Sequence, residues 1–274
     1  MEVHELLELL PSVLAAALLA LILGRPWQAK GVEGPAGLAS PVVLGLAWLS
    51  GYAAILGWPA WPPVQASDWL PCLAVLGIAA GFLEATRGAW LVRVLLSALV
   101  PWLLFAKLLG RRSALEAVLW WVICYGSYLG FWWGAAVLAQ RLPVRPLSLL
   151  WTLVASFMAP TLLLTGNAKL GQLAAVLAAA LGAMASVLWI WPASHFLLRA
   201  VPVFTLLGVS LLAIGHTDLY GETPRLCTLP LLLALPSALL AGRRAWVALV
   251  LPTLILALAL GIAIYRAELS DYGY

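Results

Sequence analysis

Long apolar runs, broken only by short polar or Gly/Pro-rich segments, dominate the chain. Residues 173–188 and 247–264, for example, carry no charged side chain. A helix needs roughly 20 mainly apolar residues to cross about 30 Å of hydrocarbon. The pattern predicts ten such crossings, each bounded by a charge, a Gly/Pro cluster or a tryptophan. Their expected ranges are 6–24, 41–57, 69–83, 89–109, 114–139, 147–164, 170–191, 195–215, 226–241 and 245–265.

These runs predict helices rather than strands. Strands of an outer-membrane barrel alternate apolar and polar residues over about ten positions, whereas the runs here are apolar throughout. Backbone N–H and C=O groups do not stay unpaired in lipid, so a continuous apolar crossing forms its hydrogen bonds within a helix. We therefore expect an all-α, polytopic transmembrane helical bundle of about ten helices, and at least eight. Residues 1–274 should form a single integral membrane domain.

Two of the ten segments are less regular than the others. The third has only about 15 apolar residues between Asp68 and Glu84, so it could be either a short tilted helix or a re-entrant segment. The first follows a tail with three glutamates and no lysine or arginine, whereas a secretory signal begins with a positive segment. We therefore expect the first segment to be retained.

Composition gives an independent argument for a membrane protein. Hydrophobic residues make up 64% of the chain and charged residues 9%, against roughly 45–50% and 25% in soluble domains. The net charge of +4 has no basic block, which argues against a nucleic-acid partner. The lipid bilayer is therefore the expected partner, and other membrane subunits or further copies of the chain stay open. The Arg excess and Ala/Leu bias suggest a GC-rich bacterial genome, and hence an inner (cytoplasmic) membrane.

The basic residues suggest an orientation. With ten crossings they divide into nine on one side and six on the other. The nine are Arg25, Lys30, Arg87, Arg93, Arg141, Arg145, Arg199, Arg243 and Arg244, and the six are Lys107, Arg111, Arg112, Lys169, Arg225 and Arg266. The positive-inside rule places the nine in the cytoplasm and both termini outside it. The cluster at 107–112 opposes this assignment, and loss of the third crossing would reverse everything after it.

Two parts of the chain share a layout that suggests a weak parallel internal repeat. Leu-Pro pairs at 70–71 and 229–230 open one segment in each part, and Ala-Trp pairs at 89–90 and 245–246 open the next. The second part begins six crossings after the first, an even number, so the relation would be parallel. If the chain is a transporter, we expect a solvated cavity near the bilayer midplane, bordered by the third, fourth, ninth and tenth helices. We expect Cys72 and Cys227, near the same face, to stay free thiols.

The residue types argue against redox cofactors and most enzyme chemistry. The three histidines, at positions 4, 195 and 216, are not spaced to hold a haem between two helices, and three cysteines do not supply an iron–sulfur cluster. No close His/Cys spacing indicates zinc. Ser127 lies in mid-span without a histidine base at its depth, so we expect its hydroxyl to bond back to its own helix. We predict no catalytic, cofactor-binding or metal-binding residues, which favours a non-enzymatic role.

Three polar groups are candidate substrate or interface sites. Glu84, Arg87 and Arg93 surround the turn after the third segment, where Glu84 and Arg87 are spaced to pair on one helix face. Asn167 and Lys169 lie in a very short connection, where Asn167 can cap the next helix. Lys169 then lies in the first turn, where a cation opposes the helix dipole and invites an anionic partner.

The third group is the most polar segment of the chain. It contains His216, Asp218 and Glu222 within residues 216–225. A histidine near carboxylates can titrate near neutral pH, and such a set could also bind a metal weakly. Each group also has a simpler explanation, which the sequence favours: charge pairing or snorkelling for the first, an interfacial turn for the second and a solvated loop for the third.

Three functions fit this pattern. A permease-like transporter of a small neutral or lipophilic solute agrees with the number of crossings, the prolines inside them and the absence of an accessory domain. The scarcity of ionisable residues at mid-membrane depth argues against ion coupling. A structural or anchoring transmembrane subunit of a larger complex is the alternative, and a lipid-modifying enzyme is the third reading. A cavity would favour the transporter, whereas dry packing would favour the subunit.

Overall fold

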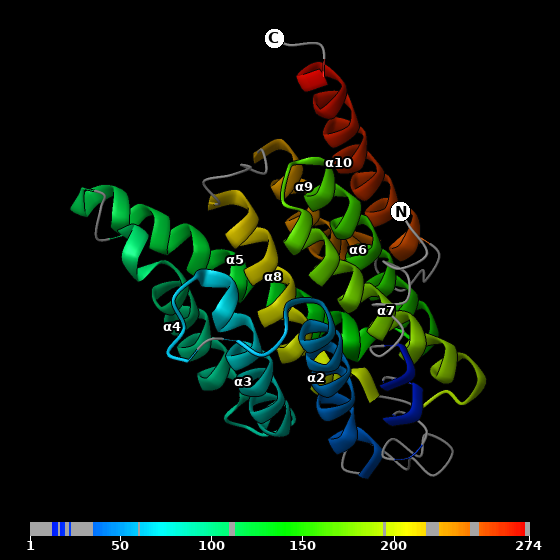
Figure 1. Ribbon diagram of the computed structural model, residues 1–274. Helices are drawn as coiled ribbons and strands as arrows, with labels where there is room; N and C mark the ends of the chain where they lie inside the picture. Colours follow the sequence, from blue (N-terminus) through cyan, green and yellow to red (C-terminus); the bar gives the residue numbers. More distant parts are fainter. Residues whose placement is uncertain are drawn as a thin grey trace.

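The computed structural model is built from helices that run back and forth in a bundle (Figure 1). It describes residues 13–15, 17–19, 22, 35–59, 61–109, 113–193, 196–217, 225–241 and 247–271. The helices are α2 (Pro35–Leu56), α3 (Leu70–Leu83), α4 (Ala89–Leu109), α5 (Ala114–Arg141), α6 (Val144–Leu164), α7 (Ala168–Ile190), α8 (Val201–Thr217), α9 (Arg225–Ala238) and α10 (Val247–Asp271). Short 3-10 helices, η2 (Ala66–Trp69), η3 (Phe196–Ala200) and η4 (Leu239–Ala241), adjoin α3, α8 and α9.

The predicted all-α polytopic bundle is confirmed. Within the described residues, eight helical segments are long and apolar enough to cross a membrane, and a shorter apolar helix covers Cys227–Ala238. α7, at 23 residues, has a length of about 34 Å, which is enough to span the hydrocarbon. The chain is therefore a multi-spanning membrane protein. The first predicted crossing, 6–24, lies largely outside the described residues.

The third segment is a continuous helical run rather than a broken one. η2 leads directly into α3, so that the run covers Ala66–Leu83, 18 residues in all. Asp68, which sets the start of the apolar stretch in the sequence, has a structural role in the turn before it. Its Oδ2 accepts hydrogen bonds from the backbone N–H groups of Val64 at 3.1 Å and Gln65 at 2.9 Å. The Asp68 carboxylate therefore accepts hydrogen bonds near the start of the helical run, and the run continues past Asp68 to Leu83.

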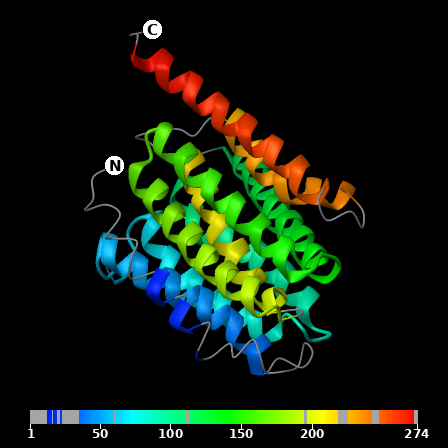
Figure 2. The same ribbon diagram turned by 90° about the vertical axis from the view of Figure 1, so that its right-hand side faces the viewer.

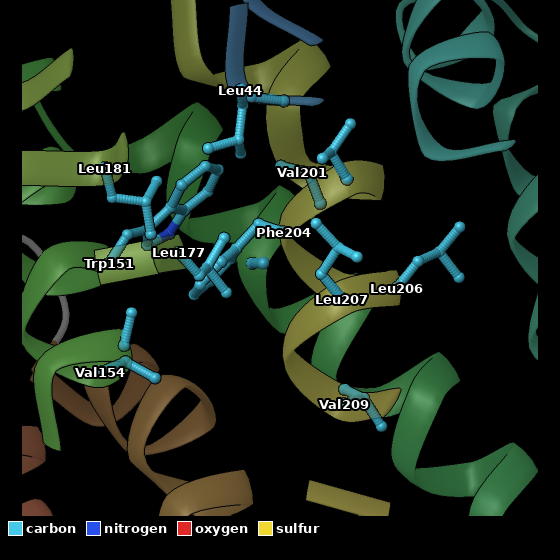
Figure 3. Close-up of a cluster of buried hydrophobic side chains, with 14 of the residues drawn as sticks. Leu44, Trp151, Val154, Leu177, Leu181, Val201, Phe204, Leu206, Leu207 and Val209 are labelled. Atoms are coloured by element: carbon cyan, nitrogen blue, oxygen red, sulfur yellow. The ribbon is translucent and has the colours of Figure 1, made fainter. Parts of the chain in front are cut away.

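α8 is the central helix of the bundle. Its most apolar window, within Phe196–Thr217, is 94% buried, whereas that of α10 is 28% buried. α8 contacts α2, α3, α5, α6, α7 and α9, which together enclose it. Trp151 of α6 stacks on Phe204 of α8 with ring centroids 4.7 Å apart (Figure 3). A buried hydrogen bond of 2.6 Å joins Tyr128 of α5 to Ser210 of α8.

Two glycines allow α3 to pack closely against the start of α8. A Cβ atom at Gly77 would lie 2.8 Å from the Cα of Val203, and one at Gly81 would lie 2.4 Å from the carbonyl oxygen of Arg199. The obstacles are backbone atoms, which cannot turn aside as a flexible side chain can. Because lipid supplies no hydrophobic drive between helices, small residues four apart are a main device for close packing in membranes.

The helices of the suspected repeat lie on different sides of the bundle. α3 packs on α2 and α8, and α4 packs on α5, whereas α9 and α10 pack on each other and on α6. Figures 1 and 2 show the α9–α10 pair on the side away from α3 and α4, with α8 between them. The prediction of a cavity between these four helices is therefore wrong. Cys72 of α3 and Cys227 of α9 are both free thiols, as expected.

Exposed tryptophans mark both ends of the bundle. Trp58 and Trp61 lie in the connection after α2, and Trp90 and Trp189 lie near the start of α4 and the end of α7. Indole rings concentrate at membrane–water interfaces, where the ring is half apolar and the N–H reaches water. Their placement agrees with two interfacial belts, one at each end of the helices.

Replacing Gly77 by alanine should destabilise the protein by about 1–3 kcal/mol, because the added methyl group overpacks the contact with the α8 backbone. Gly208→Ala is the matched control on α8, since no atom lies within 4 Å of a Cβ built there. We expect this control to be neutral or stabilising, by up to about 1 kcal/mol, through its helix propensity. Thermal unfolding in detergent would measure both. Equal melting temperatures for the two variants would contradict the close α3–α8 contact.

Candidate functional site

Glu84, Arg93 and Trp132 form an ion-pair cluster at one end of the bundle. The Arg93 guanidinium donates to Glu84 Oε1 from Nε at 3.0 Å and from Nη2 at 2.5 Å. The indole Nε1 of Trp132 donates to Glu84 Oε2 at 3.2 Å. The cluster therefore joins the end of α3, the start of α4 and the second half of α5. Both carboxylate oxygens are occupied, which is what a buried charge requires.

Burial sets the electrostatics of this cluster. The Glu84 side chain has no exposed surface and that of Arg93 is 11% exposed. Burial raises the pKa of the Glu84 carboxyl above its ordinary value, although the Arg93 charge and the hydrogen bonds from Arg93 and Trp132 oppose the rise. The Arg93 Cζ also lies 5.7 Å from the ring centroid of Trp133, which adds a cation–π contact.

The predicted partner of Glu84 was wrong. Glu84 and Arg87 were expected to pair along one helix, but α3 ends at Leu83 and a turn separates it from α4. Arg87 lies in that turn and is exposed. Arg93 instead reaches Glu84 from the next helix, across the turn. Two of the three residues proposed for this group therefore meet, and Arg87 does not join them.

Asn167 lies at the opposite end, in the tight connection between α6 and α7. Gly166 takes a φ of +90°, and the N–H groups of Gly166 and Asn167 bond back to Leu163 O and Leu162 O at 3.1 and 3.0 Å. This pattern is a Schellman motif, which needs a glycine at the left-handed position. The expected side-chain cap by Asn167 is not formed. Its Nδ2 donates instead to Gly215 O at 3.3 Å, which ties the connection to the end of α8.

Beside this connection is a pocket of about 830 Å³, called here the end pocket. Its wall comes from the loop before α3, the last turns of α2, α4 and α8, and the first turns of α7. The lining residues are Leu56, Pro63, Val64, Gln65, Ala66, Ser67, Trp69, Leu103, Leu104, Phe105, Ala106, Gly166, Asn167, Ala168, Lys169, Leu170, Leu173, Ile214 and Thr217. Ligand sites in proteins typically measure about 300–1,000 Å³ and combine apolar walls with few polar groups, and the end pocket fits this description.

The end pocket does not cross the bundle. Leu173 lies five residues into α7, so the pocket reaches about 7 Å along that helix. Beneath it, the Nε1 of Trp48 in α2 donates to Leu173 O at 3.2 Å. Buried side chains including Leu44, Leu177 and Phe204 fill the layer below (Figure 3). The pocket and the ion-pair cluster are thus separated by packed core, about 22 Å apart as measured along α3 from Trp69 to Glu84.

The remaining predicted site residues are His216, Asp218 and Glu222. His216, at the end of α8, packs against Trp120 with ring centroids 5.4 Å apart. Asp218 and Glu222 lie outside the described residues. Among the described residues no three His, Cys, Asp or Glu side chains gather as a metal site would require. The Ser127 hydroxyl donates to Ile123 O at 2.8 Å, which is the bond within its own helix that the sequence predicts.

Some features of the site could not be found by reading the sequence. Trp132 is one of four tryptophans in α5, and no local pattern distinguishes it as the partner of Glu84. Arg199 is more than nine-tenths buried in η3, and its Nε has no hydrogen-bond partner in the described part of the chain. Ser97, Trp151 and Thr205 likewise have a buried, unpartnered side-chain atom there. The end pocket combines four distant segments of the chain, so no single motif announces it.

Comparison with known proteins does not assign the chain to a family. No known family matches the chain, and no curated protein matches its sequence. Its function is therefore inferred from the end pocket and the ion-pair cluster themselves.

Replacing Arg93 by methionine should destabilise the protein by about 3 kcal/mol or more, because it leaves the Glu84 charge buried without a partner. Arg87→Met is the matched control, since it removes a positive charge from an exposed position in the turn between α3 and α4. Adding Glu84→Gln to the Arg93 variant should recover part of the loss. The measurement is denaturant or thermal unfolding in nanodiscs. An equal loss of stability from Arg87→Met would contradict a specific Glu84–Arg93 pair.

Proposed function

We propose that the chain is a permease-like membrane protein that takes a small lipophilic solute into the end pocket. The pocket itself is the observation that carries this proposal: a space of about 830 Å³ at the end of the helices, walled mainly by apolar side chains. A purely structural subunit has no need of such a space. A lipid-modifying enzyme would need a reactive group beside it, and the described lining holds no histidine, cysteine or carboxylate.

The two ends of the bundle suggest how such a permease would work. The end pocket is reached from one side, and the ion-pair cluster joins α3, α4 and α5 at the other. Transport would require the packed layer around Trp48 and Phe204 to separate and the ion-pair cluster to open. Alternating access of this kind moves one group of helices against another around a binding site. In such a cycle, the arrangement described here would be the state that is closed at the ion-pair end.

The distribution of basic residues supports an orientation for this permease. Among the described residues, five arginines lie toward the ion-pair end: Arg87, Arg93, Arg141, Arg145 and Arg199. Four basic residues lie toward the pocket end: Lys107, Lys169, Arg225 and Arg266. The positive-inside rule favours the ion-pair end as the cytoplasmic one. In a bacterial inner membrane the pocket would then open away from the cytoplasm.

A transmembrane subunit of a larger assembly is the second candidate, and α10 favours it. This helix contacts α9 and α6 and extends past the ends of its neighbours (Figure 2). A partner helix could pack on the part that extends. Measuring the mass of the purified particle in nanodiscs distinguishes the two candidate functions. A partner chain in stoichiometric amount would support the subunit, and a lone monomer or homodimer would support the permease.

Flux through proteoliposomes tests the permease directly. Octyl glucoside and octanesulfonate, radiolabelled and below their micellar concentrations, are suitable probes because their polar headgroups slow passive crossing. We expect the protein to speed the exit of at least one probe. Ala106→Trp, which fills the end pocket, should return this exit to the rate of protein-free vesicles.

The matched control is Ala79→Trp, an exposed position on α3 that does not line the pocket. This variant should transport as the unmodified chain does. Exit of both probes at the protein-free rate, or equal inhibition by the two tryptophan variants, would contradict the proposed function.

A further inference from the structure

The charge of the end pocket is unbalanced. Lys169 is the charged side chain on its wall, and the described lining holds no carboxylate. The nearby Asp68 does not line the pocket, and its Oδ2 is already engaged by the backbone N–H groups of Val64 and Gln65. Within the described ranges the ion pair that the structure contains is that of Glu84 and Arg93, at the other end of the bundle. Among the described lining residues, the one formal charge is therefore the positive charge of Lys169.

The position of Lys169 strengthens this imbalance. Lys169 is the second residue of α7, and a cation in the first turn of a helix is opposed by the helix dipole. The Asn167 side chain, which could have shielded this end, bonds to Gly215 O instead of capping α7. An anion in the pocket would relieve both unfavourable interactions. The sequence alone suggests an anionic partner here, and the structure adds a space for one.

The rest of the wall shows what the anion would be attached to. Leu56 of α2, Trp69 of η2 and Leu103 of α4 line the pocket and are partly exposed. Close to Lys169 in the sequence or on the opposing loop, Asn167, Ser67 and Gln65 bring polar groups to the same wall. A charged head and an apolar body are thus matched by two kinds of surface within one space.

We infer that the end pocket binds an anionic amphiphile, whose acid headgroup pairs with Lys169 and whose apolar tail contacts Leu56, Trp69 and Leu103. This inference rests on the proposed function, because it names the class of solute that the permease would take. Pairing with Lys169 favours a sulfonate, phosphate or carboxylate head over an uncharged head of the same size.

A matched pair of probes tests this inference. Octanesulfonate and octanesulfonamide have the same tail and nearly the same head, but at neutral pH the sulfonate carries a negative charge and the sulfonamide does not. We expect the full-length protein in phosphatidylcholine nanodiscs to bind the sulfonate more tightly in calorimetry. Lys169→Met should weaken sulfonate binding by about tenfold or more and leave sulfonamide binding within about twofold, since a hydrogen bond to a charged group is worth at least that factor.

Two variants control for unspecific effects of charge. Lys169→Arg keeps the positive charge and should retain the preference for the sulfonate. Arg141→Met removes a positive charge from an exposed position at the ion-pair end and should leave both affinities unchanged. Equal binding of the two probes, unaffected by Lys169→Met, would overturn the inference and leave the permease standing. Binding of neither probe would contradict the proposed function as well.

The source of the amphiphile is tested by changing the lipid. Adding phosphatidylglycerol to the nanodiscs supplies an anionic headgroup from the bilayer. A fall in apparent octanesulfonate affinity would support the site and identify the bilayer as a source of its ligand. An unchanged affinity, with the Lys169 dependence retained, would support a site that is filled from the aqueous side.

Discussion

The close packing around α8 is the constraint on which the rest of the structure depends. In lipid, the burial of apolar side chains does little to drive helices together, so their association depends on close packing. Gly77 and Gly81 let α3 approach the backbone of α8, and six helices in all contact α8. A central helix of this kind leaves no room for charge at mid-depth. Charged groups are therefore displaced to the two ends of the bundle.

The two ends solve the problem of charge in different ways. At one end Glu84 and Arg93 neutralise each other, and Trp132 occupies the remaining carboxylate oxygen. At the other end Lys169 faces a pocket whose described wall offers it no counter-charge. In the first arrangement the opposite charges pair within the cluster, which joins α3, α4 and α5 at its end of the bundle. The second has a lysine on a pocket wall without a carboxylate among its described lining residues, which is the reason for proposing a ligand there.

Sequence reading predicted the helices better than the site. The range expected for α4, 89–109, is the one observed, because charges and glycines delimit it clearly. The pairing of Glu84 was mistaken, since a spacing rule for one helix was applied across a helix end that apolar periodicity does not reveal. The sequence also singled out Lys169, and the structure shows that this residue lines the end pocket. Its pocket depends on how α2, α4, α7 and α8 end together, which is a property of tertiary packing alone.

The central claim is that the end pocket and the ion-pair cluster face opposite sides of one membrane. It can be tested with Val64→Cys, on the pocket wall, and Thr86→Cys, in the turn beside Glu84, each in a chain whose three native cysteines are replaced. A membrane-impermeant maleimide would be applied to intact cells and to inverted vesicles. The account predicts labelling of position 64 from outside and of position 86 from the cytoplasmic side. Labelling of both positions from the same side would contradict it.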